Sequence, residues 1–73
     1  MNNTELLKYV RKRVKQIGRS HFNMKRIESK DVTGRIIKRM NPEHYSQEEI
    51  IEACISEMKK IITFRRIEIK KNK

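Results

Sequence analysis

The sequence predicts a mainly α fold, a small three-helix domain, and three observations lead to this class. The chain has 73 residues, enough for one domain. Apolar residues recur at helical spacing in three segments. The chain holds one proline and two glycines, too few to form a flexible linker. We expect one small basic domain over residues 1–70 and a basic C-terminal tail over residues 71–73.

A first helix is expected over residues 4–17, where one apolar stripe recurs every three or four positions. The stripe consists of Leu6, Leu7, Val10, Val14 and Ile17. Asn2 and Glu5 have the spacing of a capping box at its start. Gly18 stands where a left-handed residue commonly ends a helix, so we expect the helix to stop there.

The next segment shows no clean helical face, and we expect a short strand over residues 22–27. Asp31 can then cap a second helix over residues 32–40. Gly34 lies inside this helix and costs roughly 1 kcal/mol relative to alanine, so the helix needs tertiary contacts. Asn41 and Pro42 end it, because proline disfavours helical geometry in the residue before it.

A third helix begins at Ser46, which forms a capping-box pattern with Glu49. Its apolar stripe is the longest in the chain: Ile50, Ile51, Cys54, Ile55, Met58, Ile61 and Ile62. Residues 63–70 then alternate between apolar and charged side chains, which favours a strand paired with residues 22–27. The resulting α-β-α-α-β order is winged-helix-like. A plain three-helix domain with an extended tail is the alternative.

Composition excludes several functional classes. No run approaches the roughly 18 apolar residues of a membrane span, and the first ten residues lack the apolar core of a signal peptide. The single cysteine, Cys54, fits a reducing interior, so we expect a cytoplasmic or nucleoid-associated protein. His21, His44 and Cys54 are too few for a zinc site, and so small a chain argues against an enzyme. No metal and no cofactor is expected.

Positive charge dominates the chain and is segregated along it. Nineteen Lys and Arg residues against nine Asp and Glu residues give a formal net charge of +10. Residues 1–20 hold six bases and one acid, whereas residues 41–60 hold two bases and five acids. Excess positive charge of this size indicates a polyanionic partner, although a solvated basic helix face is the alternative.

The candidate nucleic-acid-binding residues fall into two sets. The first lies on one face of the first helix, opposite its apolar stripe: Lys8, Arg11, Lys12, Lys15 and Arg19. The second is spread over the second helix and the two expected strands: Lys25, Arg26, Arg35, Lys38, Arg39, Arg65 and Arg66. Phe22, beside His21, is a candidate ring for base stacking, with a core role as the alternative.

Two functions follow from these patterns. The first is a small nucleic-acid-binding protein, either a DNA-binding regulator of transcription or a ribonucleoprotein component, that binds DNA or RNA phosphates through the first helix. The acidic start of the third helix argues against its use as a recognition helix. The second is an adaptor or inhibitor that docks an acidic protein or forms a homodimer. Its interface would be the apolar face of the third helix, at Ile51, Ile55, Met58 and Ile62.

Overall fold

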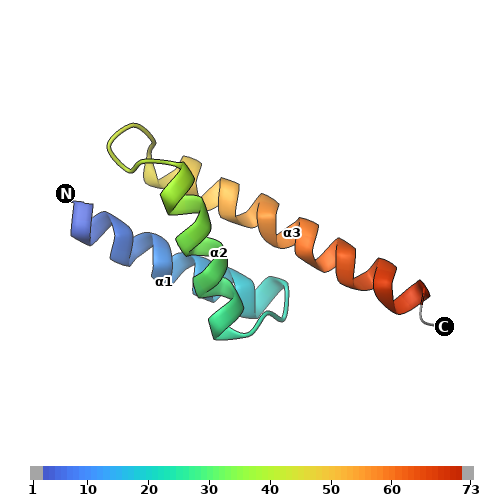
Figure 1. Cartoon of the computed structure of the whole chain (residues 1–73). Coiled ribbons are helices and arrows are strands. Elements are labelled where there is room, and N and C mark those ends of the chain that lie inside the picture. The colour runs from blue at the N-terminus through green and yellow to red at the C-terminus, as the bar shows by residue number, and fades with distance from the viewer. Residues whose placement is uncertain (1–2, 72–73) are drawn as a thin grey trace.

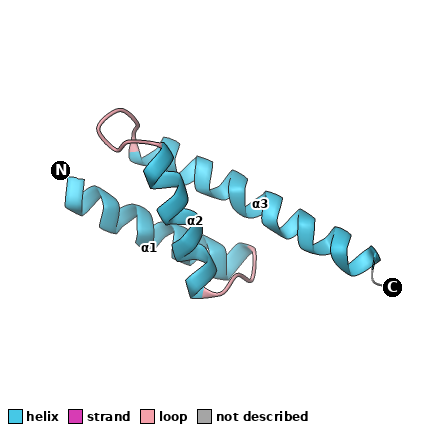
Figure 2. Cartoon of the chain, in the orientation of Figure 1, coloured by secondary structure: helices cyan, strands magenta, loops and turns pink. Residues whose placement is uncertain are grey.

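The computed structural model describes residues 3–71, which form three α-helices and no strand. They are α1 (Asn3–His21), α2 (Arg26–Arg39) and α3 (Gln47–Lys71), and Figure 1 and Figure 2 show that only short turns join them. The predicted mainly α, three-helix fold is therefore confirmed. The predicted strands at residues 22–27 and 63–70 are wrong, and the winged-helix-like order is wrong with them.

Gly18 does not end α1, contrary to the sequence prediction. It is buried inside the helix, where α1 passes close to Ser29 of α2. The chain turns instead at Asn23, whose φ of 52° is left-handed, a conformation that asparagine tolerates better than most residues. The N–H of Met24 then folds back to donate to the carbonyl of Gly18 at 2.8 Å. The predicted capping role of Asn2 lies outside the described residues.

Helix α2 begins at Arg26, well before the predicted start at residue 32. The Glu28 carboxylate accepts the N–H of Lys25 at 3.1 Å and so satisfies one donor at the helix start. Two buried positions of α2 are polar, Ser29 and Thr33, which hid the helical pattern. Their hydroxyls donate to the carbonyls of Lys25 and Ser29 at 3.3 and 2.7 Å, which removes the cost of burying them.

The predicted boundary between α2 and α3 is confirmed. Helix α2 ends at Arg39, and the Asn41 side-chain oxygen accepts the N–H of Glu43 at 3.0 Å in the turn. The hydroxyl of Ser46 accepts the N–H of Glu49 at 3.2 Å, while the Glu49 carboxylate accepts the N–H of Ser46 at 3.3 Å. This is the reciprocal capping box that the sequence predicted.

Helix α3 continues to Lys71 through the segment predicted to be a strand. Figure 1 shows its C-terminal half running past the ends of the other two helices. Phe64 and Ile67 in this half are 69% and 47% exposed. Arg65 ties this part of α3 back to the bundle through a hydrogen bond to Glu28 of α2. Lys71, predicted to open a tail, is the last residue of the helix, and residues 72–73 lie outside the described residues.

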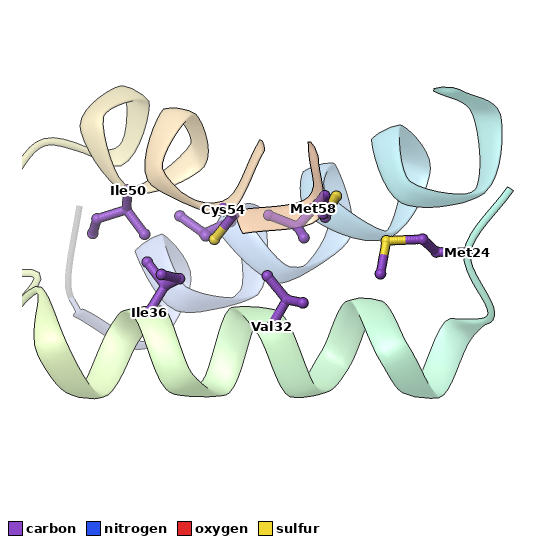
Figure 3. Close-up of a cluster of buried hydrophobic side chains, with 8 residues drawn as sticks. Met24, Val32, Ile36, Ile50, Cys54 and Met58 are labelled. Atoms are coloured by element: carbon purple, nitrogen blue, oxygen red, sulfur yellow. The ribbon is translucent and has the colours of Figure 1, made fainter. Parts of the chain in front are cut away.

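One apolar core holds the three helices together. Figure 3 shows labelled side chains of α2, α3 and the turn before α2 converging on it. The buried members are Val10, Val14, Met24, Val32, Ile36, Ile50, Cys54 and Met58. Three of them come from the long apolar stripe of α3, one helical turn apart, so α3 supplies the centre of the core. Burial raises the pKa of the Cys54 thiol to about 11.

Candidate nucleic-acid interface

A groove of about 330 Å³ lies between α1 and the first half of α2. Arg11 and Lys15 line it from α1, and Arg26 and Lys30 line it from α2. Each pair is spaced i, i+4, so both side chains of a pair leave the same face of their helix. The crossing of two helices therefore brings four cations together around one groove.

The groove has an electrostatic imbalance that an anion would relieve. Its two other lining residues, Ile27 and Thr33, carry no charge, so no carboxylate of the described residues lines it. None of its four cations forms an ion pair with another residue of the described part of the chain. Like charges spaced i, i+4 repel by roughly 0.2–0.5 kcal/mol per pair in isolated helices. Phosphate oxygens bound between the two helices would offset this repulsion, because each cation would then face a negative charge.

The basic surface continues from the groove over the outer face of α1. Lys15 also lines a shallow depression of about 550 Å³ together with Lys12 and Arg19. Lys8 is exposed one turn before Lys12 on the same helix. The structure therefore places the five candidate residues of the first helix along one side of α1, beside the groove.

The two strongest tertiary contacts of candidate cations lie on the other side of α2, toward α3. Arg35 stands 4.0 Å from the carboxylate of Glu57, and Arg65 is hydrogen-bonded to Glu28. The N–H of Lys25 and the guanidinium of Arg65 together hold the pKa of Glu28 below its ordinary value, against a smaller opposing effect of burial. Arg65 links α3 to α2, whereas the exposed Arg35 makes only a long ion pair with Glu57. Both arginines face a carboxylate, unlike the groove cations.

The remaining candidates are exposed but dispersed. Lys25 adjoins Arg26 at the start of α2, while Lys38 and Arg39 lie in its last turn. Arg66 lines a separate cleft beside the turn between α1 and α2, together with Phe22 and Lys59. Sequence reasoning missed Lys30 and Lys59. Lys30 was overlooked because the predicted second helix began after it, although its i, i+4 spacing from Arg26 would have revealed it.

The residues predicted as a partner interface occupy unequal positions on α3. Met58 is completely buried between the helices, so it serves the core. Ile51 and Ile62 are partly buried and pack against that core, and Ile55 is half-buried. The interface hypothesis stays a prediction for these three isoleucines. More strongly exposed apolar side chains lie further along α3, at Phe64 and Ile67.

Neither a metal-binding cluster nor a membrane-spanning helix occurs among residues 3–71. No group of three or more His, Cys, Asp or Glu side chains is arranged to hold a metal ion in this part of the chain. None of its three helices has both the length and the apolar character needed to cross a membrane. No family model, no curated protein and no solved structure matches this chain.

Proposed function

We propose that the protein binds nucleic acid, with the phosphate backbone following the groove between α1 and α2 and the outer face of α1. One observation carries the proposal: within residues 3–71, two helices place four cations without an ion-pair partner around a groove that no described carboxylate lines. The formal net charge of +10 supports it, because long-range attraction speeds the encounter with a polyanion. Contacts of this kind give affinity and little sequence information.

The length of the basic surface favours a polyanion over a single small anion. Lys8 and Arg19 are eleven positions apart on α1, which corresponds to roughly 16 Å along the helix axis. One strand of nucleic acid carries a phosphate about every 3.4 Å of helix axis, so several phosphates fit along this length. A DNA-binding regulator and a ribonucleoprotein component both satisfy this geometry, and the preferred substrate would distinguish them.

A salt titration tests the proposal. Fluorescence anisotropy of labelled duplex DNA, single-stranded DNA and structured RNA would be followed from low to physiological salt. Five to seven neutralised phosphates correspond to a log–log slope of roughly −4 to −6. Loss of all binding before physiological salt would contradict the proposal.

A pair of matched double variants locates the site. Arg11→Gln with Lys30→Gln removes two groove cations, one from each helix. Arg13→Gln with Lys60→Gln removes the same charge from exposed positions outside the groove. We expect the groove variant to flatten the salt slope by about 2 and the control to leave it nearly unchanged. Equal effects would show that binding depends on net charge alone.

Protein docking is the second candidate function, and the exposure of Phe64 and Ile67 favours it. Both residues belong to the C-terminal half of α3, and in Figure 1 this half runs past the ends of the other two helices. Sedimentation equilibrium of the wild type and of Phe64→Ser with Ile67→Ser tests self-association. A mass above the 8.9 kDa monomer that the double variant abolishes would support a homodimer. A monomeric wild type would leave only docking to a different, acidic protein.

A further inference from the structure

We propose that a cleft beside the turn between α1 and α2 binds one unpaired base, which stacks on Phe22 while Lys59 and Arg66 hold the neighbouring phosphates. The inference rests on the proposed function and narrows its substrate to single-stranded nucleic acid. The cleft has a volume of about 460 Å³ and is formed by the end of α1, the following turn and the middle of α3.

The apolar wall of the cleft is held rigidly. Phe22 is half-buried, because it packs against the core and also lines the cleft. Its N–H donates to the carbonyl of Gly18 at 3.3 Å, at the point where the left-handed Asn23 turns the chain. Ile62 packs against the same core and lines the cleft from α3. A ring fixed in this way loses little conformational freedom when a base stacks on it.

The rim of the cleft has the charge that a nucleotide needs. Lys59 and Arg66 are seven positions apart on α3, which places them two turns apart on one face. Within the described residues, neither forms an ion pair, and no carboxylate lines the cleft. Thr63, between them, uses its hydroxyl to donate to the carbonyl of Lys59 at 2.9 Å. An aromatic ring beside unpaired cations is the combination with which proteins bind single strands.

The cleft lies close to the groove between α1 and α2. Asn23 lines the cleft and Arg26 lines the groove, and three chain steps limit the separation of their Cα atoms to about 11 Å. A single strand that follows the groove past Arg26 would have to cross only this turn to place a base in the cleft. The bases of an intact duplex are paired and stacked, so they cannot enter without the cost of unstacking.

A comparison of two strands with the same phosphates isolates the role of the base. Anisotropy would measure the affinity of the full-length protein for a 12-nucleotide oligo-dT and for an abasic strand of equal length. We expect the wild type to bind oligo-dT about tenfold more tightly. Phe22→Leu keeps an apolar side chain in the core but removes the aromatic face, so the preference should fall to near one while the affinity for the abasic strand is retained. Phe64→Leu, at an exposed ring outside the cleft, is the control and should keep the preference.

The possible results separate the inference from the proposed function. Equal binding of both strands by the wild type, or an unchanged preference in Phe22→Leu, overturns the stacking site and leaves phosphate binding intact. No binding of either strand, when duplex DNA or structured RNA is bound at physiological salt, overturns the inference alone. Loss of binding to all of these nucleic acids before physiological salt overturns the proposed function itself. Should Phe22→Leu fail to fold, photocrosslinking of the wild type to a 5-iodouridine-containing strand decides. The adduct should map to the tryptic peptide of residues 20–25, and an adduct confined to other peptides overturns the site.

Discussion

Replacing Gly18 with alanine should destabilise the domain, although the same change inside a helix is ordinarily favourable. A Cβ at this position would clash with the hydroxyl oxygen of Ser29 and lie 3.4 Å from its Cβ. Ser29 is fully buried, and its hydroxyl donates to the carbonyl of Lys25 at 3.3 Å. The new methyl group therefore either breaks this hydrogen bond or pushes α1 away from α2.

The magnitude follows from three contributions. Overpacking in a core costs about 1–3 kcal/mol, and loss of a hydrogen bond costs about 0.5–1.5 kcal/mol. Alanine recovers roughly 1 kcal/mol through its higher helix propensity. The three contributions sum to a net loss of about 0.5–3.5 kcal/mol of unfolding free energy for Gly18→Ala, with a midpoint of about 2 kcal/mol. For a domain of this size, a loss of about 2 kcal/mol corresponds to a fall in Tm of roughly 8–16 °C.

Two controls make the prediction specific. Gly34 also lies inside a helix, but a Cβ there meets nothing within 4 Å, so Gly34→Ala should stabilise by about 0.5–1 kcal/mol. Ser29→Ala removes the clashing oxygen, so adding Gly18→Ala in that background should be neutral or stabilising. Urea and thermal unfolding followed by circular dichroism would measure all four variants. Stabilisation of the wild type by Gly18→Ala would refute the close crossing of α1 and α2 at this residue.

Two other groups have perturbed ionisation that can be tested directly. Burial raises the pKa of the Cys54 thiol to about 11, so the thiol should not react with a disulfide reagent at pH 8 in the native protein. It should react once urea unfolds the chain. Rapid labelling of the native protein would contradict the burial of Cys54. The pKa of Glu28 is lowered by the Lys25 N–H and by Arg65, so its stabilising contribution is present above the ordinary value of 4.5 and disappears as pH falls through the lower folded value. Glu28→Gln should therefore lower the free energy of unfolding at pH 7 and make that free energy less dependent on pH below about 4.5. Identical profiles of unfolding free energy against pH for the wild type and the variant would show that the carboxylate contacts contribute nothing.

Local signals in the sequence sufficed where one residue or one stripe determines the structure. The capping box of Ser46 and the stop at Asn41 and Pro42 were both predictable. The early start of α2 was not predictable. The hydroxyls of Ser29 and Thr33 donate to backbone carbonyls of the preceding turn, so these polar side chains can be buried like apolar ones. A pattern of apolar side chains alone cannot detect such positions.

The end of α3 was mistaken for a strand for a different reason. Residues 63–68 run past the core, so their order of apolar and charged side chains is not shaped by burial of one face. Alternation in this segment is therefore compatible with a helix. Its attachment to α2 through Arg65 and Glu28 depends on tertiary structure, which no local pattern contains.

The candidate site divides along the same line. The basic face of α1 was predictable because one helix carries all five residues. The groove was not, because Arg11 and Lys30 come from two helices whose crossing is fixed by the core. Charge alone makes Arg35 and Arg65 candidate nucleic-acid-binding residues. Their ion pairs with carboxylates that are distant in sequence could not be predicted.

The extension of α3 beyond the core also bears on how the backbone opens. Amide protons between Ile50 and Met58 lie over the buried stripe and should exchange with solvent only when the whole domain unfolds. Residues 63–68 are mostly exposed, so exchange of their amide protons needs only local opening of the helix. Within one continuous helix, amide exchange thus changes from requiring global unfolding to requiring only local opening. Arg65, which is hydrogen-bonded to Glu28, lies in the part that opens locally. A ligand held by Lys59 and Arg66 would slow exchange in that part of α3 first.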